Sequence, residues 1–169
     1  MMSHEVAKLI NEQINKEFYS AYLYLDMANF YSERDLDGFA NYFRIQAMEE
    51  RDHAMKFLDY LAENNEAISL EAIAKPEADR SSLMAPLVQA LKHEEFVTAS
   101  IHNIYSAAIE AADYRSQRFL GWFIDEQGEE EASARALIAK MELFGDENAK
   151  GGLYLLNQEL AARSYSPAE

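Results

Sequence analysis

The chain has 169 residues, of which 49% are hydrophobic, enough to bury a sizeable core in a single domain over residues 1–169. It contains no cysteine, which excludes disulfides and thiolate metal sites, and its formal net charge of -15 disfavours a nucleic-acid partner, because phosphates call for clustered Lys and Arg. The N-terminus lacks a basic leader, and no stretch approaches the roughly 18 apolar residues of a membrane span, so we expect a soluble cytoplasmic protein.

The predicted fold class is all-α, because only 6 Gly and 3 Pro stand among abundant Ala, Leu and Glu. Ser3 is placed to cap a first helix that runs to about Tyr31. A short turn at residues 34–38 leads into a second helix over about residues 36–64. Because this connection is short, the two helices should be antiparallel.

A long segment without clear periodicity, residues 65–81, follows the second helix. About 17 extended residues span roughly 55 Å, whereas a helix of about 27 residues is roughly 40 Å long. This connection could therefore return along the whole bundle, so that the helices before and after it run parallel. Ser81 or Ser82 is the predicted cap of a third helix, which ends near Ala111.

Asp113 is the predicted cap of a fourth helix over residues 114–144, which ends at Gly145. A shorter helix should follow over about residues 148–163. The sum is a four-helix bundle over about residues 3–144. It consists of two antiparallel hairpins joined by one long crossover connection, with a short fifth C-terminal helix.

Glutamates and one histidine recur on the predicted long helices. Glu50 and His53 are three residues apart, so both side chains lie on one helix face and could reach the same ion. Glu17 and Glu94 each lie among apolar residues at helical spacing. Both should therefore point into the bundle.

The fourth helix offers a second face with ligands, because Gln127 and Glu130 repeat the spacing of three and Glu126 lies four residues before Glu130. A buried carboxylate without a partner costs roughly several kcal/mol, and a divalent cation is the simplest compensation. Oxygen-rich ligands with a single imidazole suit iron or manganese better than zinc. Two ions that share a bridging carboxylate would match the number of ligands.

The alternative is that these glutamates form ordinary solvated helix faces, as most Glu pairs on helices do. The chain would then be a helical interaction protein without a metal, and Glu17, Glu50 and Glu94 would be exposed. The apolar and aromatic residues around them favour the metal site instead.

The chain resembles bacterial non-haem ferritins over nearly its whole length. The resemblance is carried by Asn11-Glu12-Gln13, Tyr19-Ser20, Phe57-Leu58-Asp59-Tyr60-Leu61, Glu126-Gln127 and Gly152-Leu153-Tyr154. It implies a ferritin-like fold and an iron storage protein with ferroxidase activity. Such a protein oxidises Fe(II) with O2 or H2O2 and deposits ferric mineral inside a hollow shell, a homo-oligomer of twenty-four subunits.

By this resemblance, a di-iron ferroxidase centre would hold one iron between Glu17, Glu50 and His53. Glu50 would bridge to a second iron, which Glu94 and Glu130 would complete. Each of these residues is thus both a metal ligand and part of the catalytic set that the resemblance implies.

The resemblance also implies helpers and a neighbouring site. Gln127 would lie beside the second iron as a ligand that helps to position oxygen, and Tyr24 would hydrogen-bond the ligands. A third iron site is implied at four carboxylates, Glu49, Glu126, Glu129 and Glu130. Glu49 is rotated by about 100° from its neighbour in sequence, so it should face the flank of the bundle.

Departures from sister families narrow the function. Arg51 stands where bacterioferritins carry their haem-binding methionine, so no haem is expected. Gln127 and Glu130 stand where those proteins repeat Glu-x-x-His, so the second iron should be held more weakly. The alternative function is a stand-alone di-iron or di-manganese oxidase or peroxidase without storage. Such enzymes tend to keep the symmetric motif pair or a cysteine-rich centre, and this sequence has neither.

Overall fold

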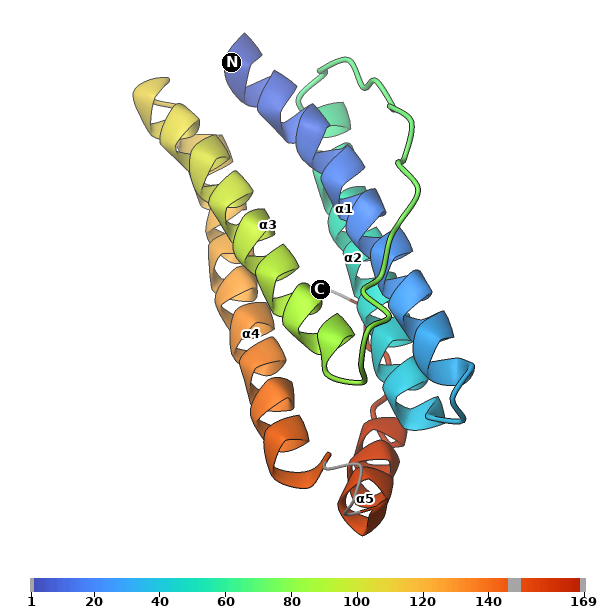
Figure 1. The fold of residues 1–169 in the computed structure, drawn as a ribbon. Helices are drawn as coiled ribbons and strands as arrows, with labels where there is room; N and C mark the ends of the chain where they lie inside the picture. Colours follow the sequence, from blue (N-terminus) through green and yellow to red (C-terminus); the bar gives the residue numbers. More distant parts are fainter. Residues whose placement is uncertain (1, 146–149, 168–169) are drawn as a thin grey trace.

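A computed structural model describes residues 2–145 and 150–167 of the chain. Four long helices lie side by side, and a short fifth helix lies at one end of the bundle (Figure 1). Their bounds are α1 His4–Ser32, α2 Asp37–Glu63, α3 Ala85–Glu110, α4 Tyr114–Phe144 and α5 Lys150–Ala161. The described residues contain no strand, so the predicted all-α bundle with a short C-terminal helix is confirmed.

The direction of the helices follows the predicted topology. The helices α1 and α2 form one antiparallel hairpin, and α3 and α4 form the other (Figure 1). The long crossover runs back beside α1 from the end of α2 to the start of α3, so α2 and α3 run parallel (Figure 1). Among the described residues, no helix combines the length and apolar composition that a membrane-crossing segment needs.

Two of the predicted helix caps are confirmed. The side-chain oxygens of Ser3 and Asp113 each accept a hydrogen bond at 3.1 Å from the backbone amide three residues later. These bonds satisfy amides that the first turn of a helix leaves open, so they fix where α1 and α4 begin. The predicted end of α4 at Gly145 is also confirmed.

The predicted start of the third helix is wrong. The helix α3 begins at Ala85, and Met84 stands at its N-cap without a side-chain hydrogen bond. Ser82 accepts from the amide of Ala85 at 3.1 Å, within a turn that precedes the helix. Pro86 fits only the first turn because it has no amide to donate, and it therefore sets the start later than serine spacing suggests.

The start of the predicted fifth helix, at about residue 148, lies outside the described residues. The described part of α5 ends at Ala161, two residues before the predicted end. Its Asn157 caps another helix, because its side-chain oxygen accepts from the amides of Gly38 at 2.8 Å and Phe39 at 3.3 Å. A Cβ at Gly38 would lie 1.7 Å from the backbone oxygen of Asn157, so this close approach requires glycine.

The crossover is held along α1 by side chains of that helix. Asn11 exchanges two hydrogen bonds of 2.9 Å with the backbone of Ser69. Further along, Asp26 accepts from the backbone amide of Ala78 at 2.9 Å and pairs with Arg80 at 2.7 Å. These contacts explain how a segment without secondary structure keeps one path along the bundle.

The apolar core is divided into two clusters, one toward each end of the bundle. One includes Phe39 and Phe43 from the first half of α2, and the other includes Phe57 and Leu61 from its second half. On every long helix, the residues between these clusters include buried polar side chains. They include Glu17, Glu50, His53, Glu94, Gln127 and Glu130.

Candidate metal centre

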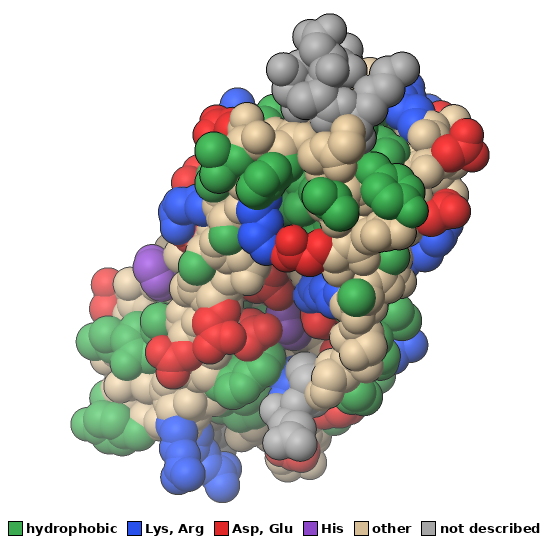
Figure 2. Space-filling model, turned by 90° about the horizontal axis from the view of Figure 1, so that it is seen from below, with side chains coloured by type: hydrophobic (Ala, Val, Ile, Leu, Met, Phe, Trp, Pro, Cys, Tyr) green, Lys and Arg blue, Asp and Glu red, His purple; other side chains and the backbone are tan. Residues whose placement is uncertain are grey.

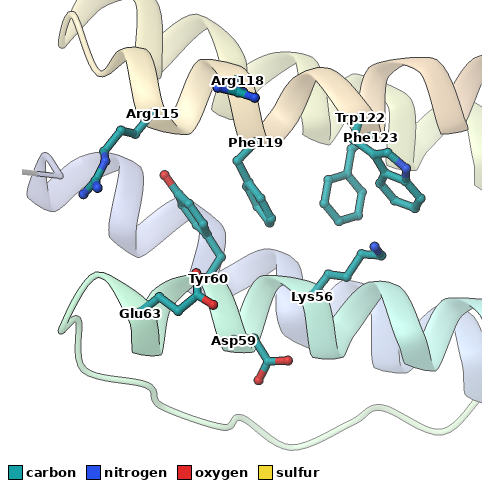
Figure 3. A pocket seen from close by; sticks show the side chains of 9 residues that line it. All are labelled: Lys56, Asp59, Tyr60, Glu63, Arg115, Arg118, Phe119, Trp122 and Phe123. Atoms are coloured by element: carbon teal, nitrogen blue, oxygen red, sulfur yellow. The ribbon is translucent and has the colours of Figure 1, made fainter. Parts of the chain in front are cut away.

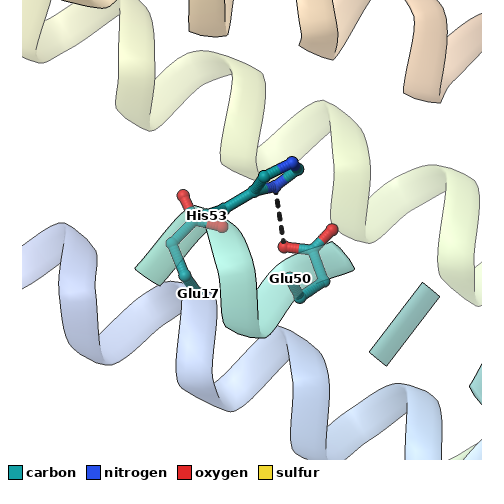
Figure 4. Close-up of side chains that lie close together, drawn as sticks. All are labelled: Glu17, Glu50 and His53. Carbon is teal, nitrogen blue, oxygen red and sulfur yellow. Dashed lines mark ion pairs between the residues drawn. The ribbon is translucent and has the colours of Figure 1, made fainter. Parts of the chain in front are cut away.

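Glu17 from α1 meets Glu50 and His53 from α2 in the middle of the bundle (Figure 4). Each offers one ligand atom such that all three atoms lie within 4.8 Å of one another. The distance from His53 Nδ1 to Glu50 Oε2 is 3.6 Å. Because each residue is only 1% exposed, the cluster is enclosed by protein and is able to surround an ion.

The hydrogen bonding of this cluster is incomplete. Among the described residues, the buried side-chain atoms without a hydrogen-bond partner include Glu17 Oε2, both oxygens of Glu50 and both ring nitrogens of His53. Buried polar atoms are almost always paired, because leaving them unpaired costs roughly 1–3 kcal/mol each. One imidazole offers only one of its nitrogens to a given ion, so one nitrogen of His53 and the open carboxylate oxygens are the atoms that a bound divalent cation would satisfy.

The other two helices place Glu94, Gln127 and Glu130 on the opposite side of the same layer. The amide of Gln127 donates to Glu94 Oε2 at 3.1 Å, and the hydroxyl of Tyr24 donates to Glu94 Oε1. The amide of Gln46 donates to Glu130 Oε2 at 2.8 Å. These carboxylates are therefore stabilised by neutral protein donors, whereas Glu50 in the first cluster has no such donor.

The solvated alternative for these glutamates is wrong. It required Glu17, Glu50 and Glu94 to be exposed, but their exposed fractions are 1%, 1% and 2%. The helical spacing among apolar neighbours therefore gave the correct orientation for all three.

Burial raises the pKa of Glu17 and Glu50 well above the ordinary value of 4.5, and nearby carboxylates raise both further. Burial followed by the charge of Glu94 raises the pKa of Glu130 to about 7. Burial also raises the pKa of Glu94, although its hydrogen bonds from Tyr24 and Gln127 act against the rise. Without a cation, this layer therefore retains protons that a metal ion would displace.

Aromatic rings cover His53 on its outer side. Its ring centroid lies 5.5 Å from that of Trp122 and 5.9 Å from that of Phe123. Burial alone would lower the pKa of His53, but the carboxylate of Glu126, 3.8 Å from Nε2, and the charge of Glu17 raise it instead. The imidazole is therefore held by packing and by the negative charge around it.

A groove of about 550 Å³ lies between α2 and α4 on the far side of these rings (Figure 3). Trp122 and Phe123 line the groove as well as contacting His53. Its other side chains include both cations and carboxylates, such as Lys56 and Asp59. The groove therefore reaches the outer wall of the centre but carries no single sign of charge.

Two glutamines that sequence reasoning missed support the centre. The amide of Gln13 donates to Glu17 Oε1 at 2.8 Å, and the hydroxyl of Ser100 donates to Gln13 Oε1 at 2.6 Å. Gln46 performs a similar role for Glu130. Gln13 lies four residues before Glu17 on the same helix face, and this spacing is the signal that could have found it. Gln46 contacts Glu130 on another helix, so no spacing along the sequence marks its role.

A small cavity adjoins the second side of the centre. It measures about 10 Å³ and is lined by Tyr24, Tyr42, Glu94 and Glu130, among others. This volume is close to the minimum that one water molecule needs. Tyr24 thus faces both a candidate ligand and a space for a very small molecule.

The predicted third site is less compact. Glu49 pairs with Arg163 at 2.7 Å, Glu126 faces His53, and Glu129 is exposed. Within the described part of the chain, these carboxylates do not gather into a cluster like that of Glu17, Glu50 and His53. Metal binding at this flank therefore stays a prediction.

The fold and this layer define a class of protein, a four-helix bundle with a buried carboxylate and histidine centre that could hold metal. Residues 7–144 match the sequence model described as a ferritin-like domain. The chain therefore belongs to the ferritin-like family.

Relatives cover nearly the whole chain. A protein from Campylobacter jejuni named "Bacterial non-heme ferritin" is 40% identical over 94% of this chain and 93% of its own. One of the same name from Staphylococcus saprophyticus is 38% identical over the full length of both. Among solved structures, an open pore ferritin from Archaeoglobus fulgidus has a TM-score of 0.93 and 38% identity, covering 97% of this chain and 100% of that one.

Proposed function

We propose that this chain binds ferrous iron at the buried centre, oxidises it to the ferric state and stores the product inside a shell built from its own copies. The observation that carries this proposal is the set of open ligand atoms on Glu17, Glu50 and His53. Relatives named as bacterial non-heme ferritins support iron storage as the function. A stand-alone oxidase or peroxidase without storage is not favoured by these similarities.

Iron in this scheme is the substrate. Glu17, Glu50 and His53 would take the first ferrous ion, and Glu50 would bridge to a second ion bound by Glu94 and Glu130. Each ferrous ion gives up one electron, so two neighbouring ions supply the two electrons that reduce O2 to H2O2 with two protons, or H2O2 to water. The protein's part is to hold both ions in one dry layer.

The protein groups around the ions would position the reaction. Tyr24 and Gln127 both hydrogen-bond to Glu94, so they would set the orientation of that carboxylate and of a small oxidant in the adjoining cavity. Iron binding would release the protons that Glu50 and Glu130 retain, because a carboxylate must be ionised to bind a metal ion.

The three flank carboxylates, Glu49, Glu126 and Glu129, would receive iron that leaves the centre. Glu126 supports this path because it lies 3.8 Å from the outer nitrogen of His53. The exposed carboxylate of Glu129, one residue before Glu130, would pass iron on toward the mineral.

Exposed apolar surface supports an oligomer. The outer face of the first hairpin exposes Tyr22 and Leu25 from α1 and Met48 from α2. Apolar side chains also gather on the face seen from the α5 end (Figure 2). Near this end the exposed large apolar residues include Leu143, Phe144, Tyr154 and Leu155. Two such surfaces on one chain would allow copies to pair and also to close a shell, here proposed to have twenty-four subunits.

Replacement of Glu50 tests the function. Glu50→Ala should slow the fast aerobic oxidation of Fe(II) by more than roughly tenfold while the oligomer still assembles, because the bridging ligand is lost. Glu63→Gln, which changes an exposed glutamate of the same helix, should oxidise iron at the original rate. Normal fast oxidation by the Glu50→Ala protein would contradict the assigned centre.

A further inference from the structure

The segment that follows α5 folds back along α2 toward the middle of the bundle (Figure 1). The side-chain amide of Asn41 donates to the backbone oxygens of Leu160 at 3.1 Å and Arg163 at 3.0 Å. Further along, the hydroxyl of Tyr165 donates to the carboxylate of Asp52. This tail, residues 162–167, is thus attached to α2 at Arg163 and at Tyr165.

The side chain of Arg163 is also bound to α2, at Glu49. Arg163 Nη2 lies 2.7 Å from Glu49 Oε2, and the two side chains are only 29% and 20% exposed. The guanidinium also stacks over Tyr42, with its central carbon 4.6 Å from the ring centroid. Since Tyr42 lines the cavity beside Glu94 and Glu130, Arg163 covers the outer wall of the proposed iron centre.

Arg163 therefore occupies an oxygen of Glu49, one of the carboxylates that the predicted third site would use. A guanidinium and a divalent ion that share one carboxylate repel each other, because both are cations in a partly buried place. The pair is also incompletely satisfied, since the buried Arg163 Nη1 has no hydrogen-bond partner among the described residues. Its hold on Glu49 thus lacks the full set of hydrogen bonds that stabilises buried ion pairs.

We propose that Arg163 is an internal cation that competes with iron for Glu49, and that iron binding at this flank releases the tail from α2. The inference rests on the proposed function, because it assumes that iron leaving the centre reaches Glu49. The tail weakens iron binding at Glu49, and iron must weaken the docking of the tail by the same factor. Because Arg163 and iron compete for Glu49, the amount of iron bound at the flank carboxylates sets how often the C-terminal tail leaves α2.

Anaerobic titration calorimetry with Fe(II) on the assembled protein tests the competition. Arg163→Gln should strengthen the weaker, flank class of sites by about fivefold, the factor that corresponds to the upper range of a partly exposed ion pair. Arg163→Lys keeps a cation beside Glu49 and should stay near the original affinity. The control Arg135→Gln removes an arginine that pairs with Glu131 at 2.5 Å on the surface of α4, and it should change neither class.

A merely structural role of Arg163 would give a different result, because loss of packing does not strengthen metal binding. An unchanged or weaker flank affinity in Arg163→Gln, with tight binding at the centre preserved, would overturn the inference alone. Absence of tight Fe(II) binding in the original protein would instead contradict the proposed function, and this inference with it.

Hydrogen exchange of the tail in the original protein tests the coupling without a substitution. Addition of anaerobic Fe(II) beyond the amount that fills the tight sites should speed amide exchange at residues 162–166. In Glu49→Gln the tail has lost its ion pair, so exchange there should be fast from the start and insensitive to Fe(II). Unchanged tail exchange in the original protein, while calorimetry shows that the flank sites are filled, would overturn the proposed release.

Discussion

The two hairpins contribute unequal halves to one buried layer. In the first hairpin, both oxygens of Glu50 are without a hydrogen-bond partner among the described residues. In the second hairpin, both oxygens of Glu94 accept hydrogen bonds, one from Tyr24 and one from Gln127. Both carboxylates are buried to nearly the same degree. The two halves therefore differ in whether protein donors already bind the carboxylate oxygens.

This difference explains how two iron sites in one layer can have unequal affinities. In the first half, Glu50 and His53 leave their ligand atoms open and Gln13 occupies only one oxygen of Glu17, so a cation can bind there without displacing a protein donor. In the second half, a cation must compete with neutral donors for Glu94 and Glu130, and each hydrogen bond is worth about 1 kcal/mol. We therefore expect the first ferrous ion to bind between Glu17, Glu50 and His53, and the second to bind more weakly.

The largest expected effect comes from removing one ligand in each half. His53→Ala should weaken binding of the first Fe(II) by about 100-fold, whereas Glu94→Gln should leave the first ion within about tenfold of its original affinity. Anaerobic calorimetry distinguishes binding of the first Fe(II) from binding of the second. Equal losses of first-ion affinity would show that the two halves bind it together, and the comparison would fail.

The pH dependence of stability tests the raised pKa of the buried carboxyl groups. A carboxyl with a raised pKa in the folded state binds more protons than in the unfolded chain, so its contribution to stability is lost as pH rises. For Glu130 this loss runs from its ordinary value of 4.5 to about 7. The midpoint of thermal unfolding of metal-free protein should therefore fall by roughly 5 °C between pH 5 and pH 8.

Glu130→Gln should reduce this fall, because the amide does not titrate. The exposed Glu95→Gln, one residue after the candidate ligand Glu94, is the matched control and should keep the original pH profile. A melting temperature that rises with pH in the metal-free protein would contradict the assigned charges.

A matched pair of glutamines gives a smaller effect. Gln13 holds Glu17 in the first half, and Gln46 holds Glu130 in the second. Gln13→Ala should weaken the first ion by about tenfold, the lower range for residues that orient metal ligands, while Gln46→Ala should leave it unchanged. Anaerobic calorimetry on both variants measures this contrast. Loss of first-ion affinity in Gln46→Ala would mean that the second half also shapes the first site.

The smallest effect separates stability from metal binding. Asn157 caps the start of α2 from outside both halves of the layer. Asn157→Ala should lower the free energy of unfolding by about 1 kcal/mol, the usual value of a lost helix cap, without changing either class of iron site. Urea unfolding of the metal-free protein measures the first quantity, and calorimetry checks the second. A change in iron affinity would show that the position of α2 depends on this cap.

Local sequence signals were sufficient for most of the fold. Ser3 and Asp113 mark helix starts through hydrogen bonds to nearby amides, and their predicted positions are confirmed. The end of α4 at Gly145 is also confirmed, and a Cβ there would lie 2.6 Å from the backbone oxygen of Met141. The start of α3 was misplaced because Ser82 and Pro86 give competing signals, and proline decides between them. Propensity alone does not rank such neighbours.

In the metal centre too, features set by nearby residues were predicted, whereas contacts between distant residues were not. The spacing of Glu50 and His53 predicts a shared face, and the structure places both beside Glu17. Gln13 and Gln46 were missed because a neutral amide carries no distinctive chemistry in a sequence. The contact of Arg163 with Glu49 joins residues 114 positions apart and depends on how α5 packs. No local pattern predicts it.

The central claim is that this chain oxidises iron and stores it. The most direct test adds Fe(II) in large excess in air and then separates the protein by size while iron and protein are followed together. We expect far more iron than the few ions of the buried centre to elute with protein in a particle of many subunits. Only a few irons per chain on a small oligomer would contradict storage and would support the stand-alone oxidase.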